Sequence, residues 1–168
     1  MKFYFPTQIN QAANELINLC RTKNIKISTI ESCTGGLLSA CLTEIPGSSA
    51  VLDRGFVTYS NEAKINEVGV NDNSLNRFGA VSNIVAREMC SGALKRPGID
   101  IAVSITGIAG PDGGTDSKPV GLVFIGLAKR KEPPTARQYI FEGDRQEIRT
   151  CALIEAMNLL KKTVNEIE

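Results

Sequence analysis

The sequence contains no histidine. Without an imidazole side chain, a Ser-His-Asp triad, a Cys-His pair and every zinc site that needs a histidine ligand are excluded. A nucleophilic enzyme of this composition must take its general base from lysine, tyrosine, aspartate or glutamate. Lysine is the leading candidate among these four.

Cysteines are few and lack a metal-binding or redox spacing. There are five, an odd number, and no two of them form a CxxC pair. This usage fits reduced thiols rather than a disulfide framework. We therefore expect each cysteine to pack as a small hydrophobic residue of the core.

The chain also lacks an excess of charge and a long apolar run. Its 19 Lys and Arg residues nearly cancel 18 Asp and Glu residues, so no strong field is available to hold a polyanion. No apolar stretch reaches the roughly 18–20 residues that cross a bilayer. The apolar part of residues 1–11 is too short for a secretory signal. We expect a cytoplasmic protein that binds neither nucleic acid nor membranes.

The 168 residues predict one domain, spanning residues 1–168, because this length can bury a core without disulfides. Hydrophobic spacing predicts helices over 7–24, 34–47, 61–70 and 81–94, and from 144 to the end of the chain. Apolar or β-branched runs predict strands over 25–32, 51–60, 100–106, 122–130 and 137–143. The last two strands are close enough to form an antiparallel hairpin. This order favours an α/β fold, a three-layer α/β/α sandwich with a mixed β-sheet.

The stretch "ESCTGG" places Ser32 between a predicted strand and a predicted helix. A helix N-terminus opened by Thr34, Gly35 and Gly36 offers backbone N–H groups that could stabilise an oxyanion in acyl transfer. The ordinary alternative is that Ser32 or Thr34 only caps the helix. Cys33 is a rival nucleophile, but neighbouring residues at a strand end face opposite ways, so only one of the two should reach a pocket.

The stretch "TYSNEAK" places Lys64 in the first turn of a short predicted helix. The helix dipole destabilises a cation at this position and lowers the pKa of the amine, which could then accept a proton from a serine. Tyr59, at the preceding strand end, could relay or orient that proton. A lysine so early in a helix is more commonly a solvated surface residue.

Residues 107–121 form a predicted loop with five glycines. The loop has neither the GKS or GKT ending of a P-loop nor the GxGxxG spacing of a dinucleotide fingerprint. It could frame a ligand crevice at the sheet edge, where Thr106 would offer its hydroxyl. The glycines could equally serve tight turns alone.

The stretch "EGDRQEIR" gives Asp144 and Glu147 the spacing of a capping box. Arg145 in the first turn and Arg149 one turn later oppose the helix dipole. A bound phosphate or carboxylate would resolve this conflict, although pairing with an acid such as Glu142 is the commoner fate of a surface arginine.

Together these stretches resemble the CinA C-terminal domain family, whose stand-alone members are nicotinamide-nucleotide amidases. The resemblance rests on the segments "ESCTGG", "PGSSAVLDRGFVTYSNEAK", "GAVS", "TGIAGPDGGT", "KPVG" and "GDR", spread over nearly the whole chain. It implies a three-layer α/β/α fold. It also implies hydrolysis of nicotinamide mononucleotide to nicotinate mononucleotide and ammonia, a step of pyridine nucleotide salvage.

The resemblance assigns roles to individual residues. Ser32 becomes the nucleophile and Lys64 its base, with Tyr59 beside them in the catalytic group. Substrate-binding positions follow the same motifs: Thr34, Gly35, Gly36, Thr106, Gly107 and Arg145. This chemistry needs no metal and no organic cofactor.

Two other functions use the same sequence features. One is a non-catalytic nucleotide-sensing or protein-interaction module of the competence and damage-inducible CinA family, and the other is a serine amidase for a different small carboxamide. Because small α/β enzymes are often homo-oligomers, we expect a homo-oligomer, with a dimer preferred.

Overall fold

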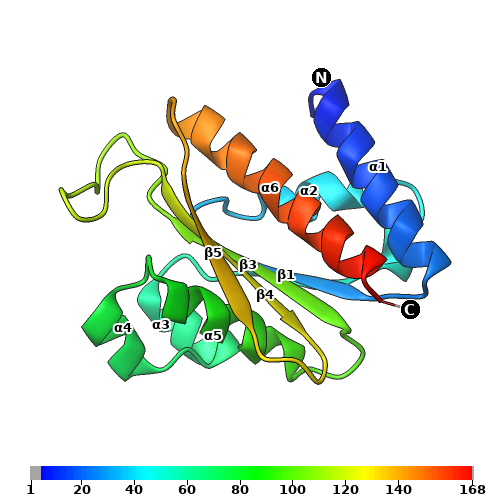
Figure 1. Ribbon diagram of the computed structural model, residues 1–168, viewed down its shortest axis with the longest axis horizontal. Coiled ribbons are helices and arrows are strands. Elements are labelled where there is room, and N and C mark those ends of the chain that lie inside the picture. Colours follow the sequence, from blue (N-terminus) through cyan, green and yellow to red (C-terminus); the bar gives the residue numbers. More distant parts are fainter. Residues whose placement is uncertain (1–4, 168) are drawn as a thin grey trace.

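The fold is built on one five-stranded sheet, seen in a computed structural model that describes residues 5–167 (Figure 1). Residues 1–4 and residue 168 lie outside the described residues. Residues 1–4 belong to the segment whose apolar part is too short for a secretory signal. The strands run in the order β2-β1-β3-β4-β5. Their bounds are β1 Ile27–Glu31, β2 Leu52–Val57, β3 Ile101–Gly107, β4 Leu122–Lys129 and β5 Thr135–Ile140. β1 is parallel to β2 and β3, whereas β4 is antiparallel to β3 and β5, which confirms the predicted mixed sheet and hairpin.

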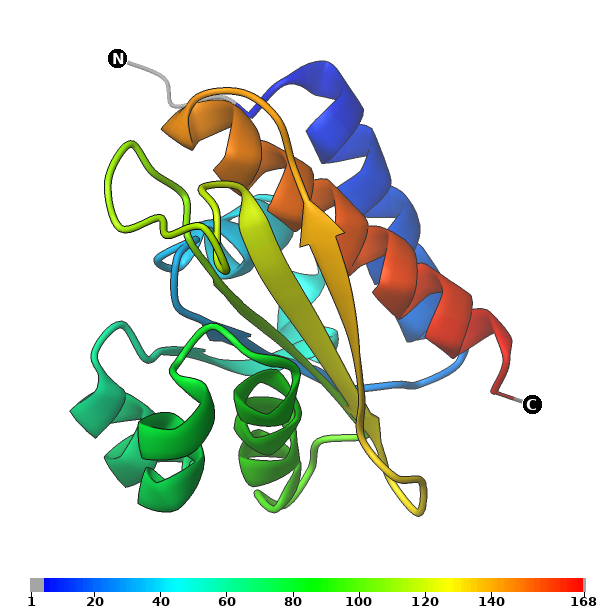
Figure 2. The same cartoon turned by 60° about the vertical axis from the view of Figure 1, so that its left-hand side comes forward.

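Helices cover both faces of this sheet, and the predicted three-layer α/β/α arrangement is confirmed (Figures 1 and 2). One face carries α1 Thr7–Thr22, α2 Leu37–Thr43 and α6 Arg145–Asn165. The other face carries α3 Asn61–Val68, α4 Asp72–Phe78 and α5 Asn83–Leu94. A short 3-10 helix, η1 Ser48–Ala50, leads into β2. Among residues 5–167, no helix has both the length and the apolarity needed to cross a bilayer.

The central strands explain why the apolar runs in the sequence are nearly continuous. Every residue of β1 is buried, and so are all but the last of β3, because both strands have neighbours on each side and helices on each face. The larger core lies beneath α1, α2 and α6, and a smaller one lies beneath α3 and α5. All five cysteines are free, and four are buried as predicted, whereas Cys151 is only partly buried.

Most predicted elements shift by up to three residues at their ends, as β5 does from the predicted 137–143 to Thr135–Ile140, and two departures are larger. α2 begins at Leu37 rather than at residue 34, because Gly35 and Gly36 adopt positive φ angles of 62° and 93° that a helix cannot accommodate. α4 falls in a stretch that the sequence assigned to no element. It is capped by the side chain of Asn71 and has only Leu75 as a buried residue, so it carries almost no hydrophobic periodicity.

The sheet brings the predicted site segments to one edge. β1, β2 and β3 are parallel, so the chain leaves all three at the same edge of the sheet, where Ser32, Tyr59 and Gly107 lie. The loop after β3 and the start of α6 reach the same edge (Figure 2). Crevices at the carboxyl ends of strands are the usual ligand sites of α/β sheets.

Candidate active site

A cavity of about 300 Å³ opens at this edge of the sheet. Small-molecule sites commonly measure roughly 300–1,000 Å³, so the cavity lies at the lower end of that range. Six of the predicted site residues line it: Ser32, Tyr59, Lys64, Thr106, Gly107 and Arg145. Thr34, Gly35 and Gly36 do not. Within residues 5–167, no group of three or more Cys, Asp and Glu side chains is arranged to hold a metal ion.

Ser32 and Lys64 form the chemical centre of the cavity. The Nζ atom of Lys64 lies 3.1 Å from the Oγ atom of Ser32. The same Nζ atom lies 2.8 Å from the carbonyl oxygen of Thr58 and 3.3 Å from that of Tyr59. Lys64 sits in the first turn of α3, which Ser60 caps, and the lysine side chain is buried rather than solvated. The predicted serine–lysine pair is therefore formed in the structure.

The surroundings of Lys64 favour a neutral amine. Burial lowers the pKa of Lys64 from its ordinary value of 10.5, and the neighbouring Cys33 opposes this shift only in part. No carboxylate in the described part of the chain forms an ion pair with the lysine. A neutral amine can donate its two N–H groups to the two carbonyl oxygens and direct its lone pair at the serine O–H. This is the arrangement that a general base requires.

Cys33 is among the residues that line the cavity, and its side chain packs in the core cluster beneath α1, α2 and α6. The strand ends at Glu31, and a turn in which the N–H of Gly35 donates to the carbonyl oxygen of Ser32 replaces the alternating pattern. Burial raises the pKa of the Cys33 thiol to about 11. The thiol is therefore protonated at neutral pH and is a poor nucleophile.

Glu31 holds the turn that carries Ser32, a role that no local pattern in the sequence indicates. Its carboxylate is fully buried and accepts hydrogen bonds from the backbone N–H groups of Gly36 (3.1 Å), Leu38 (3.0 Å) and Ser39 (2.9 Å). It also accepts one from the hydroxyl of Ser39 at 2.8 Å. Glu31 lies six residues before the start of α2, whereas capping residues normally lie next to the first turn. No sequence pattern therefore predicts this contact.

The predicted oxyanion donors Gly35 and Gly36 are therefore corrected. The N–H of Gly36 donates to Glu31, and that of Gly35 donates to the carbonyl oxygen of Ser32 at 3.1 Å. The backbone N–H groups of Cys33 and Thr34 have no acceptor within residues 5–167, but of these two residues only Cys33 lines the cavity. The free donor beside the nucleophile thus belongs to the residue that follows it. Ser32 does not cap α2, and neither does Thr34, whose hydroxyl is buried without a partner in the described part of the chain.

Because four donors depend on the Glu31 carboxylate, we predict that Glu31→Gln lowers the free energy of unfolding by about 2–4 kcal/mol. An amide nitrogen would face donors that only an oxygen can satisfy. Urea unfolding measures the effect. Glu44→Gln, at the exposed end of α2, is the matched control and should change the stability by less than about 0.5 kcal/mol. Equal effects of the two substitutions would show that the carboxylate does not hold the turn.

Thr106 faces the cavity, but its hydroxyl proton is already engaged. The Oγ1 atom donates to the carbonyl oxygen of Ala80 at 2.9 Å, and the side chain is almost fully buried. Thr106 can therefore offer a ligand only the lone pairs of its oxygen. The bond also ties the segment before α5 to the end of β3, which fixes one wall of the cavity.

Tyr59 and Arg145 lie at the rim of the cavity. The Nη1 atom of Arg145 donates to the carbonyl oxygen of Gly110 at 2.8 Å, and its Nη2 atom lies 3.5 Å from the hydroxyl of Tyr59. The Tyr59 side chain is 62% exposed. Within the described residues its hydroxyl bonds to neither Ser32 nor Lys64, since only its backbone carbonyl touches the lysine. The geometry therefore gives no support to the predicted proton relay through the phenol.

Comparison with known sequences identifies relatives over nearly the whole chain. A sequence profile of the CinA C-terminal domain matches residues 9–164. A putative competence-damage inducible protein of Caldicellulosiruptor saccharolyticus is 49% identical over 156 residues, which cover 92% of this chain and 38% of that protein. A CinA-like protein of Chloroherpeton thalassium is 49% identical over 150 residues, 88% of this chain and 36% of that protein. The chain thus spans less than two fifths of the length of either relative.

Solved structures of similar proteins share the whole fold. The crystal structure of the competence/damage inducible protein CihA from Agrobacterium tumefaciens has a TM-score of 0.93 at 43% identity, and the match covers 98% of this chain and 99% of that one. A CinA superfamily protein from Klebsiella pneumoniae has a TM-score of 0.89 at 33% identity and covers 94% of this chain and 98% of that one. These names mention competence and damage but no chemical reaction.

Proposed function

Since this chain belongs to the CinA C-terminal domain family and places a buried lysine amine 3.1 Å from a serine hydroxyl, we propose that it is a serine amidase acting on nicotinamide mononucleotide. The products are nicotinate mononucleotide and ammonia. The observation that carries the proposal is the contact between Lys64 and Ser32 in a cavity of small-molecule size. The substrate comes from the resemblance to nicotinamide-nucleotide amidases and from the arginine at the cavity rim.

In the first half of the reaction, neutral Lys64 takes the hydroxyl proton as the Oγ atom of Ser32 attacks the carboxamide carbon. The carbonyl oxygens of Thr58 and Tyr59 stabilise the ammonium that forms on Nζ. The negative oxygen of the tetrahedral intermediate binds the free backbone N–H of Cys33, the residue that follows the nucleophile. A well-placed donor of this kind contributes about 3–4 kcal/mol to transition-state stabilisation in other acyl-transfer enzymes.

In the second half, the proton on Lys64 passes to the leaving nitrogen, so that ammonia departs and an ester of Ser32 remains. Lys64, neutral again, then takes a proton from a water molecule that attacks the ester carbon. Collapse of the second tetrahedral intermediate returns this proton to the Ser32 oxygen and releases nicotinate mononucleotide. Lys64 thus handles all four proton transfers of the two half-reactions.

The proposal is tested by ammonia release from nicotinamide mononucleotide with the purified chain, measured from pH 5 to 10. We expect turnover whose rate rises with pH on an acidic limb, because only the neutral amine of Lys64 can act as the base. The absence of turnover across this range would refute the amidase. Binding of the mononucleotide without turnover would instead support the nucleotide-sensing module.

Arg145 is the proposed contact of the substrate phosphate, because its guanidinium lies at the cavity rim and forms no ion pair within residues 5–167. We predict that Arg145→Gln raises KM for the mononucleotide at least about tenfold, the loss of one charge-assisted contact. The KM for nicotinamide riboside, which lacks the phosphate, should change little. Arg87→Gln, on the exposed side of α5, is the control. If Arg145→Gln leaves the ratio of the two KM values as it is in the unmodified protein, Arg145 does not bind the phosphate.

A further inference from the structure

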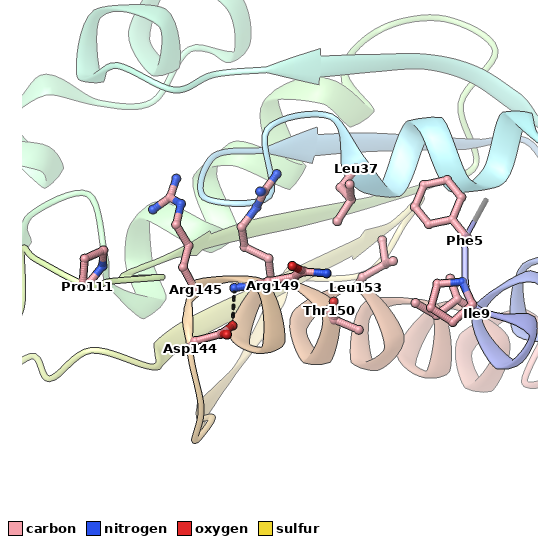
Figure 3. Close-up of a pocket in the computed structure, with 11 residues that line it drawn as sticks. Phe5, Ile9, Leu37, Pro111, Asp144, Arg145, Arg149, Thr150 and Leu153 are labelled. Carbon is pink, nitrogen blue, oxygen red and sulfur yellow. Dashed lines mark hydrogen bonds between the residues drawn. The ribbon is translucent and has the colours of Figure 1, made fainter. Parts of the chain in front are cut away.

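A second and larger cavity lies on the other side of Arg145 (Figure 3). It measures about 650 Å³, and we call it the α6 cavity because the first turns of α6 form its floor. Leu37 of α2, Pro111 of the loop after β3, and Ile9 of α1 complete its walls. Arg145 is the only lining residue that it shares with the catalytic cavity. A substrate bound at Ser32 would occupy the catalytic cavity, so it does not account for the α6 cavity.

The charges facing the α6 cavity are unbalanced. Arg145 and Arg149 project from successive turns of α6 toward the same side (Figure 3). Both lie near the N-terminus of the helix, where the dipole disfavours cations. The acidic residues beside them are occupied by the helix cap. The side chain of Asp144 accepts from the N–H groups of Gln146 and Glu147, and the side chain of Glu147 accepts from the N–H of Asp144.

Neither arginine has an acidic partner in the part of the chain that the structure describes. The ion pairs there join Arg54 to Asp53, Lys129 to Glu132 and Lys161 to Glu15. Arg149 donates through Nη2 to the carbonyl oxygen of Thr34 at 2.8 Å, but its Nε atom is buried without an acceptor within residues 5–167. An anion lying against the cavity side of this guanidinium would balance a positive charge that no carboxylate pairs with in the described part of the chain.

Apart from the capping residue Asp144, which also lines the α6 cavity, the remaining walls are mostly apolar. Phe5, Ile9, Leu37 and Leu153 line it opposite the arginines, and Thr150 and Gln146 add two neutral polar groups. A concave site with apolar walls and a few convergent polar groups is the usual form of a small-molecule site. An inorganic anion would use the arginines but leave the apolar wall without a partner.

We propose that the α6 cavity binds a small phosphate monoester with an apolar body, at a site separate from the catalytic cavity. The phosphate lies against Arg149 and the adjoining edge of Arg145, and the apolar body packs between Leu37 and Leu153. Two guanidinium groups match a phosphate dianion better than a carboxylate monoanion. Through Arg149 the ligand is one hydrogen bond from Thr34, in the turn that carries the nucleophile.

The test uses phenyl phosphate as the probe, titrated calorimetrically into the full chain. We expect Gln146→Glu to weaken binding about tenfold, because it places a negative charge in the α6 cavity at an exposed position that lines no part of the catalytic cavity. Gln138→Glu makes the same change on an exposed position of β5 and should leave the affinity unchanged. Arg149→Gln should also weaken binding at least tenfold, with Arg87→Gln as its control.

Inorganic phosphate, benzoate and phenol complete the experiment, and each should bind at least about tenfold more weakly than phenyl phosphate. Phosphate that binds as tightly as phenyl phosphate would exclude the apolar contact, and equal binding of benzoate would exclude the preference for a dianion. No binding of phenyl phosphate, or binding that both Gln146→Glu and Arg149→Gln leave unchanged, would overturn the site. Calorimetry needs no turnover, so the result is independent of whether the chain proves to be an amidase.

Discussion

Replacing Ser32 with alanine should lower kcat for hydrolysis of nicotinamide mononucleotide by about 10⁴–10⁶-fold, the loss seen when a hydrolase loses its nucleophile. The Oγ atom of Ser32 is the hydroxyl in contact with the buried amine of Lys64, and without it no acyl-enzyme can form. Steady-state ammonia release measures kcat. Because the backbone contacts of the turn are unchanged, substrate affinity measured by calorimetry should stay within a few-fold of the original value.

Cys33→Ala is the matched control for the serine, since the two residues are neighbours and line the same cavity. With a thiol pKa of about 11, Cys33 is protonated at neutral pH, so its removal should leave kcat within a few-fold of the original. The reverse pattern, an inactive Cys33→Ala and an active Ser32→Ala, would establish a thiol nucleophile. It would also refute the serine mechanism.

Replacing Lys64 with methionine should lower kcat by at least about 10²–10⁴-fold, the usual contribution of a general base. Methionine has a similar length but cannot take the proton of Ser32. The acidic limb of the pH–rate profile should also disappear from the residual activity, because it reports the protonation of Lys64. A variant that keeps the limb would show that another group is the base.

Lys64→Met also changes how stability depends on pH. The pKa of Lys64 is lowered in the folded protein, so between that value and 10.5 the unfolded chain binds more protons than the folded one. The free energy of unfolding of the original protein should therefore rise with pH across this window. Urea unfolding at several pH values should show this rise reduced in Lys64→Met and retained in Lys95→Met, an exposed control at the end of α5. An identical slope in both variants would show that Lys64 is not the group responsible.

The pairing of Ser32 with Lys64 could be predicted because each residue has a local signal. Each follows a run of strand-forming residues, and each lies close to the start of a helix. Parallel strands end at the same edge of a sheet, so two such local signals suffice to bring distant residues together. The same reasoning placed Thr106 at this edge of the sheet, and it lines the cavity together with Gly107, which the resemblance assigned to the site.

The details that the sequence did not reveal depend on contacts without a local pattern. Glu31 looks like the last residue of a strand, and only the positive φ angles of Gly35 and Gly36 turn the chain so that this carboxylate meets the start of α2. For the same reason the sequence could not show that the N–H groups of Gly35 and Gly36 are already bonded within the chain. The bond from Arg149 to Thr34 joins residues 115 positions apart, which no spacing rule can anticipate.

The exposed ring of Tyr59 at the cavity rim has a spectroscopic consequence. The sequence contains no tryptophan and three tyrosines, so the ultraviolet emission of the protein comes from tyrosine alone. Tyr4 lies outside the described residues, and Tyr139 donates to the carboxylate of Glu155 and stacks on Phe141. Of the two tyrosines that the structure describes, Tyr59 is the one at the site, and an aromatic ligand entering the catalytic cavity should quench its emission directly. The protein carries its own optical reporter of occupancy, without an added label.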